Sequence, residues 1–307
     1  MPTDNINPAV VSNVKPTVNI KNLTEKAIII SIKVGMFTGQ KKDKKASQEV
    51  ATNNSTDANS VRVWKSLLRG EELKNLQNQA QKIRLTYYRL TSCWNDNERI
   101  CKITSYLEVK QHLEKEIREY YDLAQVAIAA YDGLVNKDKQ SLGDLFNIAD
   151  YPSKVSFASA FYAHINVKPV ESNDFRSGML DDAEVAAINK EIENRIDNAI
   201  KTSQKDNLNR VHETLNKLVE RILVSEEGRF HASTVTNVID AINEARNLNI
   251  DDDKNMSGLL DKVEASIKQI DPVSVRDTHA GRSDALIAAK QSVYQITKAM
   301  EDLGFDS

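Results

Sequence analysis

Apolar residues recur at helical spacing through most of this 307-residue chain, from about Ser60 to Leu303. Stripes of this kind are typical of amphipathic helices, which bury one face against another helix and expose the other face. Glycine and proline are scarce, at 10 and 6 residues, so little interrupts the pattern. The chain is therefore predicted to be mostly α-helical, and long packed helices favour an assembly or binding role over catalysis.

Two apolar stripes predict a long helical hairpin in the first half of the chain. One stripe runs over residues 64–90, with Gly70 as a candidate kink, and the other runs over residues 103–135. Only a short polar bend, residues 91–98, separates them. We therefore expect two antiparallel helices, each about 45 Å long.

A second helical unit is predicted to begin at Asp181, where acidic side chains suit the positive end of a helix dipole. Its first helix is very long. The polar Ser203, Gln204 and Asn207 interrupt its apolar stripe and are expected to be exposed or to mark a kink. Three shorter helices are expected near 233–247, near 256–269 and from Pro272 to about 303.

β-branched residues predict two strands, at residues 27–34 and 161–167, which could pair into a small two-stranded element lying on the helices. Residues 40–59 are polar and are expected to form an exposed, mobile loop. The predicted organisation is an extended N-terminal arm, a unit with the strands and the hairpin, and a C-terminal helical unit, over residues 1–24, 25–178 and 179–307.

Composition narrows the functional classes. The net charge of −3 and the pI of about 6.0 lack the overall basic excess of a dedicated duplex-DNA binder, although a local basic patch remains compatible with them. Two cysteines cannot build a disulfide framework, which favours a reducing cytoplasm. The N-terminus does not resemble a signal peptide, and the longest apolar run, residues 27–37, is too short to span a bilayer.

No complete catalytic, nucleotide-binding or metal-binding motif is present. The segment after Gly35 superficially resembles a phosphate-binding loop, but three residues rather than four precede Gly39 and Gln40 stands where lysine is needed. Residues 251–262 resemble a calcium loop but lack its central glycine and its final glutamate, so helix capping is the expected role of these acids. We expect no catalytic residue, no metal ligand and no cofactor.

Four lysines form the densest charge cluster of the chain: Lys41, Lys42, Lys44 and Lys45. They could bind phosphates without reading a sequence, with an affinity that falls steeply as salt rises. The alternative is a solvated loop, and it is favoured because Asp43 and Glu49 dilute the charge.

The polar bend between the predicted hairpin helices contains a tryptophan. Trp94 at an exposed tip could anchor a protein partner or stack on a nucleic-acid base, with Arg99 beside it as a further nucleic-acid contact and Asp96 as a further partner contact. The favoured alternative is structural: Trp94 covers the tip, while Asp96 caps the next helix and pairs with Arg99.

Self-association is also predicted. The apolar stripe of the very long helix, which includes Ile192 and Leu215, is long for a chain of this size, and the shorter helices after it are not expected to cover it fully. A second copy of the chain is the favoured cover. The alternative is that this helix packs back on the N-terminal hairpin and completes a monomer.

Several short motifs, taken in order, resemble an uncharacterised protein family of tailed bacteriophages and prophages. Besides the strand that ends at Gly35, they are Thr91-x-x-Trp94-x-Asp96-x-x-Arg99, Leu142-Gly143-x-Leu145-Phe146, Tyr151-Pro152-Ser153, Lys168-Pro169-Val170, Asp174-Phe175-Arg176 and Leu248-Asn249-Ile250-Asp251. The resemblance spans about residues 25–303. It implies a phage protein made in the bacterial cytoplasm, with an AAA+ ATPase as a candidate partner because some relatives sit near AAA+ ATPase and von Willebrand A-type genes. It implies no catalytic residue.

Together these patterns favour a non-enzymatic, oligomeric helical protein that acts by binding a macromolecule and does not enter a membrane. The alternative is a nucleic-acid-binding accessory factor that uses the lysines of residues 41–45 and an aromatic tip. Salt-dependent DNA binding would favour the second hypothesis, and assembly without DNA would favour the first.

Overall fold

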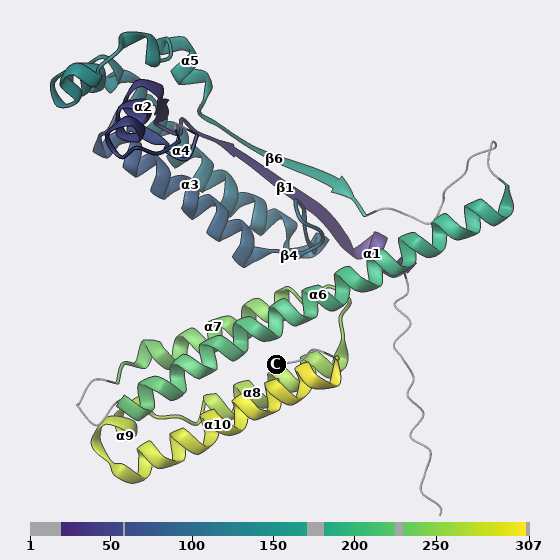
Figure 1. Ribbon diagram of the computed structural model, residues 1–307. Helices are drawn as coiled ribbons and strands as arrows, with labels where there is room; N and C mark the ends of the chain where they lie inside the picture. The colour runs from purple at the N-terminus through teal and green to yellow at the C-terminus, as the bar shows by residue number, and fades with distance from the viewer. Residues whose placement is uncertain (1–19, 58, 171–180, 225–229, 305–307) are drawn as a thin grey trace, which may run out of the picture.

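The computed structural model describes residues 20–57, 59–170, 181–224 and 230–304. Over these residues the chain is mostly helical, as predicted, and it forms two units that lie side by side (Figure 1). The first contains a helical hairpin and two small sheets, and the second is a helical bundle. None of the described helices combines the length and the apolar character needed to cross a membrane.

The predicted helical hairpin is confirmed. Helix α3 (Glu71–Leu90) packs antiparallel on α4 (Ile103–Leu142), which is continuous over 40 residues, or roughly 60 Å. The amide of Gln79 donates to the side-chain carboxylate of Glu116 (2.8 Å) and so ties the middle of the two helices together. Leu76, Ile83 and Leu113 lie in the fully buried seam between them.

The start of the first predicted helix is wrong, because α3 begins seven residues after Trp64. Gly70 is the N-cap of α3 and not a kink, with extended backbone angles (φ −163°, ψ 164°). A Cβ atom at this position would lie 2.6 Å from the end of the Leu134 side chain, so a larger residue would require that side chain on α4 to shift. Trp64 itself belongs to a strand, β3 (Val63–Ser66).

Strands β1 (Ala27–Gly35) and β6 (Tyr162–Pro169) form at the predicted places and pair antiparallel over their length. The predicted two-stranded element is too small, however. The bend after α3 is a hairpin of β4 (Ser92–Cys93) and β5 (Arg99–Lys102), and β5 pairs with β1. The result is a four-stranded sheet in the order β4-β5-β1-β6, one face of which packs on the α3–α4 hairpin.

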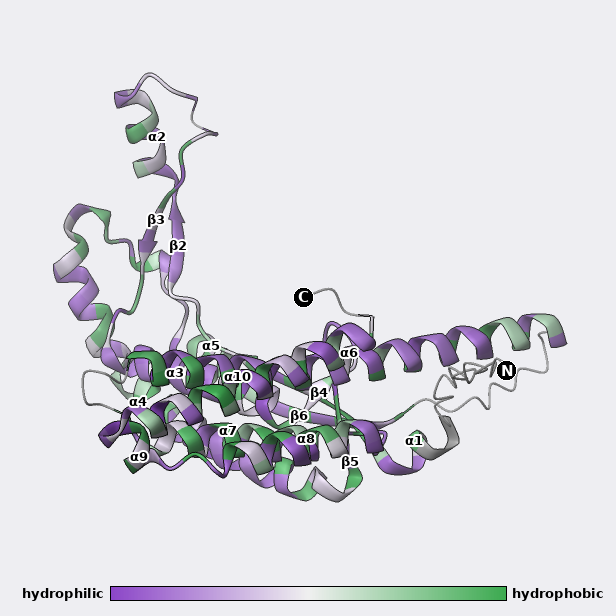
Figure 2. Cartoon of the chain, turned by 90° about the horizontal axis from the view of Figure 1, so that it is seen from below, coloured by the Kyte–Doolittle hydropathy of each residue, from purple (hydrophilic) through white to green (hydrophobic). Residues whose placement is uncertain are grey.

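A second, two-stranded sheet and a helix replace the predicted loop at residues 40–59. Strand β2 (Gln40–Asp43) leads directly into α2 (Lys44–Asn53), and the chain returns through β3, which pairs antiparallel with β2. We call residues 40–66 the basic arm. It projects away from the rest of the molecule, with α2 at its far end (Figure 2).

The C-terminal unit is a bundle led by α6 (Asp182–Leu223), the very long helix that the sequence predicts, and Asp181 caps its first turn. Helices α7 (Ala232–Asn247) and α8 (Lys254–Ile267) form at the predicted places. The last predicted helix is divided into α9 (Pro272–Asp277) and α10 (His279–Asp302). Contacts join α6 to α7, α7 to α8, α8 to α10 and α10 to α6, so the four long helices enclose one core.

A third apolar core joins the two units. It contains Ile29 and Ile100 from the sheet, Ile250 from the loop after α7, and a line of isoleucines on the first half of α6. Because α6 packs against the sheet as well as inside the bundle, the expected boundary at residues 178 and 179 does not separate two independent cores.

Small connecting elements complete the first unit: the 3-10 turns η1 (Gly143–Leu145) and η2 (Ile148–Asp150), and helix α5 (Lys154–Ser159). The expected extended arm at residues 1–24 lies mostly outside the described residues. Its end is not extended, because α1 (Ile20–Lys26) is a short helix. The Asp174-Phe175-Arg176 motif also lies outside the described residues.

Candidate macromolecule-binding arm

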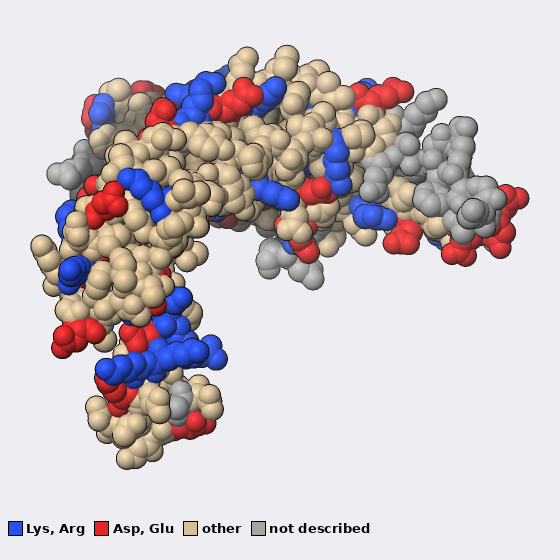
Figure 3. Space-filling view, turned by 90° about the horizontal axis from the view of Figure 1, so that it is seen from above, with Lys and Arg blue, Asp and Glu red and all other residues tan. Residues whose placement is uncertain are grey.

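The basic arm gathers the lysine cluster on a projecting element. Residues 40–66 contain six basic and three acidic residues, a local charge of +3 in a chain whose net charge is −3. Lys41, Lys42, Lys44, Lys45 and Arg62 are all exposed. Figure 3 shows lysine and arginine side chains forming a band across the arm. The lysines that the sequence singles out therefore lie together on the protein surface.

One face of the β2–β3 ribbon combines a lysine with an aromatic ring. Directly opposite residues of an antiparallel pair share a face, and Lys42 is opposite Trp64 while Gln40 is opposite Ser66. All four residues are exposed, and the Trp64 side chain keeps 54% of its surface in solvent. Sequence reasoning missed this tryptophan because it fits the helical stripe that continues into α3. The β-branched and aromatic residues Val61, Val63 and Trp64 were the available signal for a strand.

Helix α2 is fixed to the ribbon by short-range polar contacts. Asp43 caps the helix by accepting from the amide of Ala46 (3.0 Å), and the Ser47 hydroxyl accepts from the amide of Val63 (2.9 Å). Lys44 and Lys45 lie in the first turn of α2. Among the described residues their one ion pair is a long one within the helix, from Lys45 to Glu49 (4.0 Å). Their charge is therefore available on the surface.

A buried ion-pair cluster holds the base of the arm. The Lys65 ammonium lies between the carboxylates of Asp43 (3.2 Å) and Asp150 (2.5 Å) and donates to the Leu145 carbonyl (2.9 Å). Burial acts to lower the pKa of Lys65, but the hydrogen bonds to Asp150 and Asp43 outweigh it and raise the pKa. The pKa of Asp43 is lowered, chiefly by the backbone amide of Ala46 and further by Lys65.

Replacing Lys65 with methionine is expected to loosen the arm without unfolding the protein, because it leaves two carboxylates at the base without their cation. Amide exchange over residues 40–66 should accelerate, while exchange in the α3–α4 hairpin stays unchanged. The wild-type anchor should weaken below pH 4, as pH falls through the lowered pKa of Asp43, and above pH 10.5, as it rises through the raised pKa of Lys65. Unchanged exchange in the arm would contradict this role of Lys65.

The structure does not bring the other predicted contact residues to this surface. Trp94 is half-buried and packs against the core that joins the two units. Asp96 is exposed in the β4–β5 turn, but the turn is held by Asn95, which accepts from the amides of Asn97 and Glu98. The expected capping by Asp96 is therefore wrong, since α4 begins at Ile103 after Lys102.

Arg99 is buried and structural, which corrects its expected role as a nucleic-acid contact and as a partner of Asp96. Its Nε donates to the carbonyl (3.2 Å) and the hydroxyl (2.8 Å) of Thr91, just beyond the end of α3. From α6, Arg210 donates to the Tyr88 carbonyl (2.8 Å). Asp206 accepts from both guanidinium groups, at 3.3 Å from Arg99 and 2.7 Å from Arg210. Two cations thus lie at the negative end of the α3 dipole.

This arrangement shifts the pKa of Arg99 downward, first because of burial and second because of the neighbouring Arg210. Asp206 opposes that effect. The i, i+4 spacing of Asp206 and Arg210 indicates an ion pair in the sequence, but nothing local indicates that the pair meets the end of α3. We call these three charged residues the joint cluster.

Polar residues in the middle of α6 hold the loop that follows α7, within the C-terminal unit. Ser203, Gln204 and Asn207 are buried, not exposed as predicted. The Asn207 amide donates to the Leu248 carbonyl (2.9 Å), and the Gln204 amide donates to the Asp251 carboxylate (3.0 Å). These contacts position the 248–253 loop, whose Asp253 caps α8 as expected.

The expected self-association contacts lie inside the molecule. Leu215 is fully buried in the core of the C-terminal bundle, and Ile192 is 7% exposed in the core that joins the units. The shorter helices and the sheet therefore cover these positions within one chain. Self-association stays a prediction, but these two side chains are not available to a second copy.

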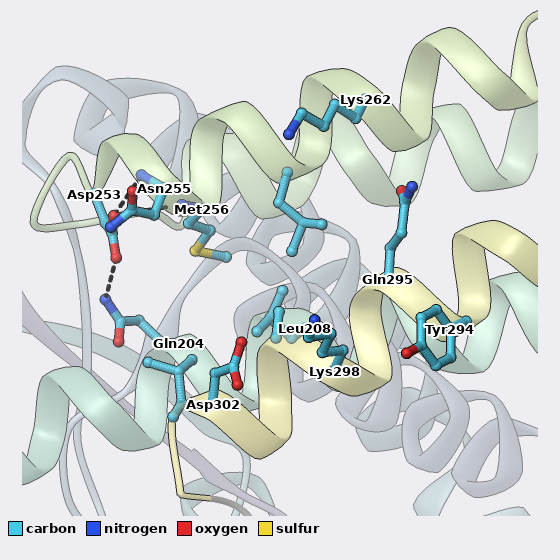
Figure 4. A pocket seen from close by; sticks show the side chains of 13 residues that line it. Gln204, Leu208, Asp253, Asn255, Met256, Lys262, Tyr294, Gln295, Lys298 and Asp302 are labelled. Atoms are coloured by element: carbon cyan, nitrogen blue, oxygen red, sulfur yellow. Dashed lines mark hydrogen bonds between the residues drawn. The ribbon is translucent and has the colours of Figure 1, made fainter. Parts of the chain in front are cut away.

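A cavity of about 610 Å³ opens between α6, α8 and α10 (Figure 4). Leu208 and Met256 lie on its apolar side, and the Gln204 side chain reaches Asp253 across one end. Lysine and aspartate side chains both occur on its rim, so its charge is mixed. Its lining contains no histidine, cysteine or serine.

Within the described ranges, histidine, cysteine, aspartate and glutamate side chains form no group of three or more that could hold a metal ion. Burial raises the pKa of the Cys101 thiol to about 12, so that sulfur stays protonated. Comparison with protein-family models, with curated proteins and with solved structures finds no match for this chain.

Proposed function

We propose that this protein acts by binding nucleic acid through its basic arm, a binding role rather than a catalytic one. The observation that carries the proposal is the projection of five exposed basic residues on one anchored element of an otherwise acidic chain. A phosphate backbone attracts such a cluster without any need for base-specific contacts, and binding releases counterions. The overall charge of −3 is consistent with this role because the basic residues are concentrated and not spread.

The anchoring of the arm supports the same role. An unstructured lysine loop would lose conformational entropy on binding, whereas these lysines lie on a strand and on a capped helix. The positive charge of Lys65 is paired with Asp43 and Asp150 inside the base of the arm. The exposed lysines therefore form a separate group that faces solvent. The binding surface is therefore largely preorganised.

The test is a charge reversal of Lys41, Lys42, Lys44 and Lys45 to glutamate, with binding to single-stranded and duplex oligonucleotides measured at several salt concentrations. The wild type is expected to bind more weakly as salt rises. The variant should lose measurable binding, since the four lysines supply up to about 3 units of the log–log salt slope with a single strand and up to about 3.6 with a duplex. Anionic polyglutamate serves as a probe for an acidic protein surface, and we expect it to bind less tightly than oligonucleotides.

A matched control reverses four exposed lysines outside the arm: Lys115, Lys137, Lys139 and Lys190. It makes the same change in net charge, so it should keep most of the binding if the arm is the contact surface. Equal losses in the two variants would show that only total charge matters. A wild type that binds no nucleic acid at low salt would remove the proposal, and tighter binding to polyglutamate would point to an acidic protein partner instead.

Two further expectations from the sequence stay proposals: assembly into an oligomer, and work beside an AAA+ ATPase in a phage-infected cell. The first now needs a surface other than Ile192 and Leu215. Light scattering of the purified chain, with and without an oligonucleotide, would separate assembly that precedes nucleic-acid binding from assembly that depends on it.

A further inference from the structure

Trp64 lies where an aromatic ring and a cation are presented together. It is more than half exposed, and its cross-strand partner is Lys42 on the same face of the ribbon. Large exposed aromatic side chains are costly to hydrate, and this one has no core to enter because its neighbours Val63 and Lys65 take the inward face. The strand register therefore holds the ring on the outside of the arm.

We propose that this face of the basic arm binds single-stranded nucleic acid, with one base stacked on Trp64 and a neighbouring phosphate bound by Lys42. The inference rests on the proposed function and names its substrate class. Base–aromatic stacking beside a basic groove is the usual way in which proteins bind single strands without reading their sequence. Gln40 and Ser66 flank the pair on the same face and offer hydrogen bonds to a base edge.

Stacking on Trp64 favours a single strand over a duplex. In a duplex the base faces are stacked on one another, so Trp64 would find none to cover. An unpaired base can stack on the ring without first leaving a duplex stack.

The fluorescence of Trp64 can be used to measure binding at this face directly. The chain has two tryptophans. Trp94 is half-buried and directly follows β4, which lies at the opposite end of the first unit from α2 (Figure 1). In a Trp94→Phe background, an oligothymidylate of about 20 nucleotides should quench Trp64 emission on binding, because a stacked base covers the indole. A duplex of the same length should bind more weakly and quench less.

The deciding variants are Trp64→Ala and Trp64→Phe. The first should weaken oligothymidylate binding by roughly tenfold to hundredfold and change duplex binding little, while the second should keep most of the affinity. Tyr294→Ala is the matched control, since this tyrosine is 66% exposed on α10 and should not contribute. Thermal melting of each variant should match the wild type, because Trp64 packs in no core.

The outcomes separate this inference from the proposed function. Equal binding of both probes, with no loss in Trp64→Ala but full loss in the lysine reversal, would overturn the stacking role and leave electrostatic binding by the arm intact. A loss in Trp64→Ala that Trp64→Phe does not restore would also overturn stacking. If the wild type binds neither probe at low salt, both proposals fail.

Discussion

Replacing Leu113 with aspartate is expected to unfold the first unit of this protein. The side chain is fully buried in the seam of the α3–α4 hairpin. The change removes buried apolar surface and buries a carboxylate among the apolar side chains of the seam, a combined cost of more than about 4 kcal/mol. That is a large share of the stability of an ordinary domain. Circular dichroism should show a melting transition lowered by about 10 °C or more.

Leu107→Asp on the same helix is the matched control. Leu107 is 66% exposed, so the same change there should leave the melting temperature close to that of the wild type. The sequence pattern assigns both leucines to the apolar stripe of one helix, and only their burial separates them. If Leu113→Asp melts like Leu107→Asp, the hairpin core is assigned wrongly.

Replacing Asp206 with alanine is expected to separate the two units more than it unfolds either one. The change leaves the guanidinium groups of Arg99 and Arg210 facing each other beside the end of α3, and Arg99 is buried. The Asp206 side chain is 36% exposed, so solvent screens these ion pairs and the expected cost of the change is about 1–2 kcal/mol. The loss of stability should be confined to the joint cluster and the 248–253 loop, because Asp206 belongs to neither the hairpin core nor the bundle core.

Hydrogen exchange with mass spectrometry gives the required resolution. Exchange should accelerate in β4, β5 and the 248–253 loop and stay slow in the centre of α4. Glu213→Ala, an exposed carboxylate two turns further along α6, is the control for loss of one negative charge. Loss of protection throughout the chain would instead mean that the two units fold as one, and unchanged exchange at the joint would show that Asp206 contributes nothing there.

Local pattern accounts for the parts of the fold that the sequence predicts. The stripes of α3, α4 and α6 and the β-branched run of β1 each arise within one element, where side-chain period decides which face is buried. Even the pairing of β1 with β6 is anticipated, because few other segments can form a strand.

The basic arm shows why other parts are not predicted. Trp64, Leu67 and Leu68 fit a helical period, yet Trp64 pairs with Lys42 in a ribbon. Two distant contacts decide the outcome: Lys65 is buried by Asp150, and the amide of Leu68, which has a positive φ of 57°, is held by Asp138 of α4 (2.5 Å). Neither contact has a signature in the residues around Trp64.

The candidate site likewise has features that local sequence predicts and features that depend on packing. The clustering of four lysines and the dominance of long helices can both be read from the residues alone, because both are properties of neighbouring residues. Contacts between distant segments are what place these lysines on an anchored arm beside Trp64 and bury Arg99, Ile192 and Leu215. Exposure depends on what segments far away in the chain cover, and that is settled by packing and not by local sequence.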